Sequence, residues 1–209
     1  MIPVAPQPEP TLPTFDFDVE VRRPGCMWLN NNNIALNAPP PNPKKLPPHW
    51  RNCLKHLWDA YGGTCAYLAV YFPFPIGAAN VEHFVAKSKN AGDAYEWSNY
   101  RLASFGPNRL KRDFNDVLDP FTLAPDTFFL DPFLKGAIIP NPSLAPTSLA
   151  AAKRTIGRLN LDSEECREMR KGYFSEYLCD RNESRVVALR YLRKHSPFVH
   201  YEAQRQGLL

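Results

Sequence analysis

The chain has 209 residues, of which 44% are apolar, 22% charged and 12% aromatic, a length and composition that fit one packed domain with embellishments. Its formal charge of +4 permits a polyanionic partner without requiring one. Proline is unusually frequent: there are 22 prolines, and twelve of them lie in the first 48 residues. The usual level is only about 5%. The composition therefore excludes a helical bundle, a coiled coil and a fully disordered chain, and it predicts a packed domain behind a proline-rich leader.

The N-terminal residues, the apolar runs and the cysteines indicate the cellular compartment. The first residues carry neither a basic start nor an apolar stretch, so we expect no secretory signal. The longest apolar run, residues 65–72, is far shorter than the ~20 residues of a membrane span. Five cysteines at irregular spacing form no CxxC pair, which argues against a disulfide framework and a four-cysteine zinc site. We expect a cytoplasmic protein with reduced thiols and no membrane contact.

Taken in chain order, residues 1–48 are expected to form an irregular proline-rich arm, because each proline removes a donor and favours extended geometry in its predecessor. Alternating apolar residues at 15–21 allow a short strand within this arm. Residues 49–61 carry one apolar stripe at helical spacing and are followed by two glycines, a pattern that predicts a helix and its end. The aromatic and aliphatic run at 65–72 is expected to be a buried strand.

The middle of the chain predicts a small mixed structure. Residues 80–85 and 99–103 are short strand candidates separated by a polar loop. A helix is expected at 108–114, with Pro107 near its first position. Residues 119–147 are punctuated by proline again and are expected to form a connection packed on the core, with a strand near 128–130.

The C-terminal part has helical composition. We expect helices at 148–159, from a cap at Asp162 or Ser163 to about Cys179, and at 182–195. The sequence thus predicts an α+β fold with an arm at 1–48, a core at 49–118, a connection at 119–147 and a helical extension at 148–209, together one compact unit.

A group of polar residues in the core could carry chemistry. Glu82 and His83 lie together at a predicted strand end, where a local bulge would let both side chains address one site. A carboxylate is a suitable ligand for Mg²⁺, and a neutral histidine can take a proton from water. Asn99 and Asn108 can fix geometry or donate an oxygen, and Lys111 lies one helical turn after Asn108.

This pattern of Glu82-His83, Asn99, then Asn108-x-x-Lys111 resembles the HNH nuclease family with its ββα-metal fold. The resemblance spans residues 65–114. A narrower resemblance points to a bacterial anti-phage subgroup of the Septu or retron-linked kind, in which the nuclease works beside an ATPase. It rests on the following segments: Arg23-Pro24-Gly25, Trp28-Leu29, Tyr95–Ser104 and Asp119-Pro120-Phe121.

The chain departs from the family in two ways. Many members bind a structural zinc through two CxxC pairs, but the corresponding positions here, 65–68 and 104–107, retain only Cys65. No structural zinc is therefore expected. The family also commonly has aspartate where this chain has Glu82, and the longer side chain could alter the affinity for a metal that demands regular octahedral geometry.

The resemblance implies roles for the site residues. His83 would be the general base of phosphodiester hydrolysis, Glu82 and Asn108 would hold Mg²⁺ or Mn²⁺, and Asn99 would hold the hairpin loop and so orient His83. Four cations would meet phosphate oxygens: Lys111 and Arg109, with Lys87 and Arg101 as weaker candidates. The implied partners are DNA, with RNA also open as a substrate, and an ATPase.

Other interpretations stay open. A lone Glu-His pair is commonly surface decoration, Asn99 could be a turn residue, and Arg109 could be a solvated helix residue. The arginine-rich segment 181–194 could be a solvated face or could follow a nucleic-acid backbone. The alternative function is a binding subunit that holds nucleic acid or an ATPase on the same scaffold without cleaving.

Overall fold

The computed structural model describes residues 1–76, 78–131 and 135–209. It combines helices with three small two-stranded antiparallel sheets, which is an α+β composition. The chain forms two compact units, and the division differs from the expected one. The first unit contains residues 1–4, 64–72 and 116–209, and the second contains residues 5–63 and 73–115.

The second unit begins with the proline-rich arm, which is more ordered than its composition predicts. Strands β1 (Thr11–Leu12) and β2 (Phe15–Asp16) pair, and a π-helical turn (Asp18–Arg22) leads into helix α1 (Arg23–Asn31). Helix α1 was not predicted from the sequence, although Pro24 stands in its first turn, where a missing N–H is harmless.

Two contacts fix this arm within the second unit. The Arg22 guanidinium forms ion pairs with Glu9 and with Glu96, and the Glu96 oxygen lies 3.1 Å from Nε. A Cβ at Gly25 would approach the ring of Tyr95 to 2.3 Å, so only glycine allows α1 to pack this closely. The arm is therefore part of the packed unit.

The expected helix at 49–61 is divided. A 3₁₀ turn (His49–Arg51) precedes helix α2 (Leu54–Ala60), and an earlier 3₁₀ turn covers Pro43–Lys45. Trp50 and Leu57 are buried, which confirms part of the predicted apolar stripe.

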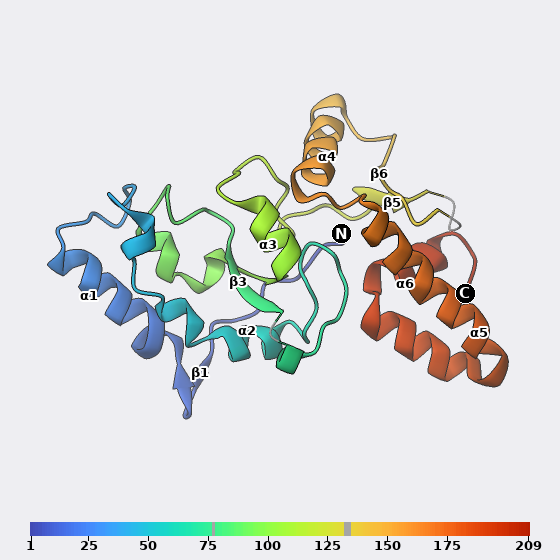
Figure 1. The fold of residues 1–209 in the computed structure, drawn as a ribbon, viewed down its shortest axis with the longest axis horizontal. Helices are drawn as coiled ribbons and strands as arrows, with labels where there is room; N and C mark the ends of the chain where they lie inside the picture. The colour runs from blue at the N-terminus through green and yellow to red at the C-terminus, as the bar shows by residue number, and fades with distance from the viewer. Residues whose placement is uncertain (77, 132–134) are drawn as a thin grey trace. The chain divides into compact units, whose positions relative to one another are not determined.

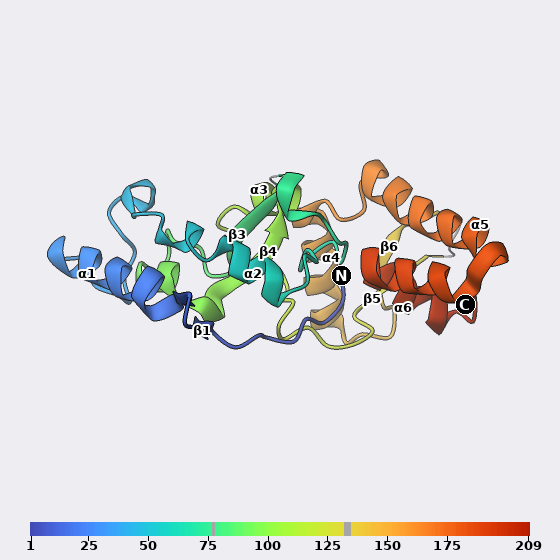
Figure 2. The same cartoon turned by 90° about the horizontal axis from the view of Figure 1, so that it is seen from below.

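The centre of the second unit is a β-hairpin followed by a helix. Strand β3 (Ala79–His83) pairs with β4 (Tyr100–Ser104), with Glu82 opposite Arg101 and His83 opposite Tyr100. Helix α3 (Phe105–Lys111) follows directly and packs against both strands, as the labels β3, β4 and α3 in Figure 2 let the reader follow. The two strands lie within two residues of where the sequence predicts them. The helix spans Phe105–Lys111 rather than the predicted 108–114, so it begins and ends three residues earlier.

The apolar run at 65–72 is not a strand. It forms a tight turn in the first unit, in which the Ala69 amide donates to the Cys65 carbonyl and the Cys65 amide to the Val70 carbonyl. Cys65, Tyr67 and Ala69 are buried all the same. A short apolar run shows that a segment is buried but does not fix its backbone conformation, which is why the strand prediction was wrong.

The rest of the first unit consists of strands β5 (Phe128–Leu130) and β6 (Ile138–Pro140) and of three helices. The helices are α4 (Pro146–Leu159), α5 (Glu164–His195) and α6 (Pro197–Arg205). The predicted strand at 128–130 and helix at 148–159 are confirmed, whereas α6 was not predicted.

Helix α5 contains the two helices expected at 163–179 and 182–195. Ser163 caps its start by accepting from the Cys166 amide, as predicted. The backbone leaves helical geometry at Ser184, with φ −154° and ψ 98°, and the two halves fold back side by side (Figures 1 and 2). In keeping with this reversal, Tyr191 in the second half lies close enough to Tyr173 in the first to interact electrostatically.

Within the described residues, every helix lacks the combination of length and apolarity that a membrane span requires.

Candidate active site

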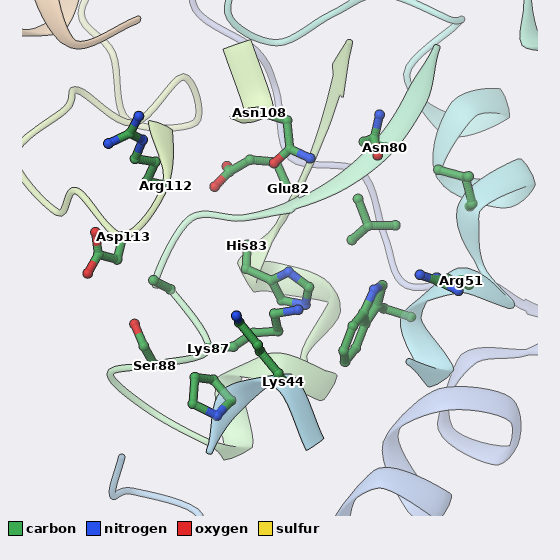
Figure 3. Close-up of a pocket in the computed structure, with 15 residues that line it drawn as sticks. Lys44, Arg51, Asn80, Glu82, His83, Lys87, Ser88, Asn108, Arg112 and Asp113 are labelled. Atoms are coloured by element: carbon green, nitrogen blue, oxygen red, sulfur yellow. The ribbon is translucent and has the colours of Figure 1, made fainter. Parts of the chain in front are cut away.

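A pocket of about 570 Å³ lies on the hairpin of the second unit (Figure 3). Its wall comes from three stretches of chain: the segment 43–54 of the arm and its turns, the segment 80–88 around the end of β3, and the segment 108–113 at the end of α3. Glu82, His83 and Asn108, which the sequence singles out for chemistry, all line it.

The His83 imidazole is held in one orientation. Its Nε2 lies 3.1 Å from the carbonyl oxygen of Ala94, and the ring meets Trp50 and Tyr100 edge to face at centroid distances of 5.0 and 5.1 Å. Because a carbonyl can only accept, Nε2 carries the proton and Nδ1 is left as the basic nitrogen. Burial, with the nearby positive charge of Lys87, lowers the pKa of His83 to about 3, so the ring is neutral at pH 7.

Glu82 and Lys111 form a buried ion pair. The Lys111 Nζ lies 2.7 Å from Oε1 of Glu82, and the two side chains are 0% and 3% exposed. The ammonium also donates to the carbonyl oxygens of His83, at 3.1 Å, and Phe84, at 2.7 Å. Since an ammonium has three protons, these three acceptors use all of them. Lys111 thus joins α3 to the end of β3 at the two consecutive residues, Glu82 and His83.

Asn99 holds the loop that returns from β3 to β4. Its Oδ1 accepts from the Val85 amide at 2.7 Å, and its Nδ2 donates to the carbonyls of Val85 and Asp93 at 3.0 and 2.8 Å. The backbone of the same residue accepts from the Phe84 amide. Asp93 directly precedes Ala94, whose carbonyl orients His83, so Asn99 acts on His83 through this loop. That position is the one the sequence analysis anticipates for it.

Oxygen ligands for a metal are present but few. Glu82 supplies a carboxylate, and Asn108, which is half-buried, supplies an amide from α3. Asn80 also lines the pocket, because residues two apart on a strand share a face. Among the described residues no group of three or more His, Cys, Asp or Glu side chains could hold a metal. One carboxylate with neutral amides does suit Mg²⁺, which keeps several waters and is commonly bound through one or two carboxylates and substrate phosphates.

The structure separates the four predicted phosphate contacts. Lys87 lines the pocket, whereas Arg109 is exposed on α3 and is not among the lining residues. Arg101 is 3% exposed and donates to the carbonyls of Ser98 and Tyr100 at 2.8 and 3.0 Å. Lys111 is fully buried on Glu82. For Arg101 and Lys111 the expected contact with phosphate is therefore corrected: both cations stabilise the hairpin.

Several pocket residues were missed by the sequence analysis. Lys44, Trp50 and Arg51 come from the segment before α2, and Arg112 with Asp113 follows α3. Arg112 adopts φ 51° and ψ −123°, a conformation that non-glycine residues rarely tolerate. No sequence motif marks residues 43–51, because their approach to the hairpin depends on long-range packing. Asn80 could have been found from its spacing to Glu82.

No protein-family model matches the chain, and no curated protein matches it.

Proposed function

We propose that the chain is a metal-dependent endonuclease of the HNH type that hydrolyses phosphodiester bonds in DNA. The observation that carries this proposal is the His83 imidazole, which is neutral, oriented through Nε2 by the Ala94 carbonyl, and in one pocket with Glu82 and Asn108. The hairpin of β3 and β4 followed by α3 has the order of elements that the ββα-metal fold requires.

In this mechanism His83 takes a proton from the attacking water on Nδ1, because Nε2 is engaged with Ala94. Glu82 and Asn108 would hold Mg²⁺ or Mn²⁺, which would supply neutralisation of the charge that develops on the phosphate oxygens and on the leaving 3′ oxygen. Lys111 holds the Glu82 carboxylate in place, and Asn99 holds the loop that carries Ala94. Lys111 and Asn99 are therefore positioning residues.

A second candidate function is a binding subunit that does not cleave. One observation favours it: Lys111 already neutralises the Glu82 carboxylate at 2.7 Å, so the pair is balanced without a metal. Such a protein would use the pocket to hold nucleic acid or a partner ATPase.

The resemblance to the anti-phage subgroup also suggests the biological role of the protein. We infer a cytoplasmic effector of bacterial anti-phage defence that works beside an ATPase. Phosphodiester hydrolysis does not itself distinguish DNA from RNA, because only contacts with the 2′-hydroxyl read the sugar. Both nucleic acids therefore belong in the assays.

The test is cleavage of supercoiled plasmid by the full chain with Mg²⁺ or Mn²⁺, with and without excess chelator. The nuclease proposal expects nicking that requires the metal and disappears with the chelator. Binding of plasmid without nicking in either metal, alone and with any ATPase that is encoded beside its gene, would support the second candidate instead.

A further inference from the structure

The pocket has two ends of different chemistry. In the view of Figure 3, Glu82 and Asn108 lie on one side of His83, and Lys44 and Lys87 lie on the other. Arg51 and Arg112 also line the wall. Within the described ranges, no carboxylate lies within ion-pair distance of any of these four cations. The end formed by Lys44, Arg51 and Lys87 is called the cationic end below.

Lys87 is the most informative member of the cationic end. Its ammonium lies 4.0 Å from the centre of the Trp50 ring, and the same ring meets the edge of His83. The side chain is partly buried, and burial with the neighbouring Arg51 charge lowers the pKa of Lys87. Two cations held near each other without a counter-ion are unfavourable in the free protein. This repulsion between the two positive charges is removed when an anion binds between them.

A second polar group lines the pocket at the edge away from Arg51 (Figure 3). The Ser88 hydroxyl is buried, lines the pocket and makes no hydrogen bond among the described residues. A buried hydroxyl without a partner costs free energy comparable to a lost hydrogen bond. A phosphate oxygen accepts hydrogen bonds, so a phosphate on this part of the wall would satisfy the hydroxyl.

We propose that Lys87 and Arg51 form a subsite for a phosphate group of a nucleic-acid strand, next to the phosphate that is hydrolysed, and that Ser88 meets another phosphate of the same strand along the pocket wall. Trp50 links the subsite to the base, because its ring contacts both Lys87 and His83. This inference rests on the proposed nuclease function and adds residues 43–51, the end of the arm and the turn after it, to the substrate site. Lys44, from the same stretch as Arg51, and Arg112, which follows α3, extend the positive wall along the strand.

The position of Arg112 indicates that the ligand is a nucleic-acid strand rather than a single small anion. Its backbone occupies a strained region at φ 51°, and strain of this kind persists where the surrounding structure enforces it, most commonly at functional sites. The cations that line the pocket thus come from before α2, after β3 and after α3. A backbone with repeated phosphates can contact all three places.

The experiment measures binding of a fluorescein-labelled 20-nucleotide DNA duplex by the full chain carrying His83→Ala, which prevents cleavage, in Mg²⁺ over a series of salt concentrations. Lys87→Gln is compared with Lys89→Gln, a matched control, because Lys89 is exposed and does not line the pocket. The same sequence as single-stranded DNA and as RNA distinguishes the possible sources of the phosphate.

We expect Lys87→Gln to weaken binding by about tenfold, the effect of one charged hydrogen bond, and to lower the slope of log affinity against log salt by about 1. Lys89→Gln should change neither quantity, and Lys87→Arg should restore most of the affinity. Ser88→Ala should weaken binding without lowering the melting temperature, because its hydroxyl has no partner to lose. A purely structural role for Lys87 would not change the salt slope.

Two results would overturn the inference, and they are distinguishable. Equal affinity and equal salt slope for Lys87→Gln and Lys89→Gln, with binding otherwise intact, would remove the subsite and leave the nuclease proposal standing. Failure of the His83→Ala protein, folded by its melting temperature, to bind any of the three nucleic acids, together with no nicking by the unsubstituted chain, would remove both proposals.

Discussion

The ion pair between Lys111 and Glu82 has left water almost entirely, since the side chains are 0% and 3% exposed. Removing both charges from water is expensive, and their attraction compensates only when every remaining donor and acceptor is satisfied. Lys111 meets this condition through its bonds to the carbonyls of His83 and Phe84. The pair therefore determines how the end of β3 is held against α3.

Lys111→Met should lower the free energy of unfolding by about 3–5 kcal/mol, because it takes the ammonium away from a carboxylate, Glu82, that stays buried. The double variant Lys111→Met with Glu82→Gln should lose less, since it also removes the buried negative charge that Lys111 neutralised. Urea unfolding measures both. Lys55→Met is the matched control: Lys55 pairs with Asp59 at the surface, and an exposed pair contributes less than about 1 kcal/mol. Equal losses for Lys111→Met and Lys55→Met would show that the buried pair does not stabilise the hairpin.

At the scale of single residues, the sequence pattern singled out Glu82, His83, Asn99 and Asn108. The structure places Glu82, His83 and Asn108 in one pocket, with partners that the pattern did not predict. The role of Asn99 in the loop agrees with expectation because it depends on a hairpin of local sequence. The burial of Lys111 could not be predicted, because helical spacing says which residues share a face and not what that face covers. Arg101 lies on a strand, where alternation likewise gives the face but not what covers it; its guanidinium donates to the carbonyls of Ser98 and Tyr100.

The elements that were predicted best are those with short-range signals. Strands β3 and β4, helix α4 and the Ser163 cap of α5 follow from alternation, composition and capping. Helix α1 was missed because the proline count was interpreted as irregular structure along the whole arm, although a proline in a first helical turn is favourable.

At the scale of the elements, the interruption of helix α5 at Ser184 can be tested most directly. At Ser184 the hydroxyl accepts from the Val187 amide at 3.5 Å, so this residue caps the second half of the helix. Ser184→Ala should cost about 0.5–2 kcal/mol of stability, the usual effect of losing such a cap.

Hydrogen exchange of the amides after residue 184, together with urea unfolding, measures this effect. Ser175→Ala is the control, because Ser175 is exposed within the first half of the helix, where alanine is the better helix former. A stability loss no larger for Ser184→Ala than for Ser175→Ala would contradict the capping role.

On the scale of the whole molecule, the chain alternates between its two units. Residues 1–4 and 64–72 belong with 116–209, and the Val4 amide donates to the Pro120 carbonyl and the Tyr71 amide to the His195 carbonyl. The expected division into four consecutive segments did not anticipate this, because local composition carries no information on contacts between residues distant in sequence. The pocket lies within the second unit alone, so the proposed chemistry depends on residues 5–63 and 73–115.

The arm has a larger role in the proposed function than its composition indicates. Proline-rich sequence predicts a covering segment, but residues 43–51 supply one wall of the pocket. Their contribution follows from where the chain is placed by packing, through contacts such as the Tyr95 hydroxyl with the Pro47 carbonyl at 3.1 Å. Nothing in the sequence predicts that Lys44 and Arg51, the cations of this segment, line a pocket.

The most direct test of the central claim is the single-turnover rate of plasmid nicking in Mg²⁺ or Mn²⁺ by the full chain, by His83→Ala and by His56→Ala. His56 stacks on Phe15 and does not line the pocket, so it controls for the loss of an imidazole. Because His83 would be the base, its removal should slow nicking by about 10²–10⁴-fold while the protein stays folded, and His56→Ala should nick at nearly the original rate. Nicking by folded His83→Ala at the rate of the unsubstituted chain would contradict the assignment of His83, and with it the proposed active site.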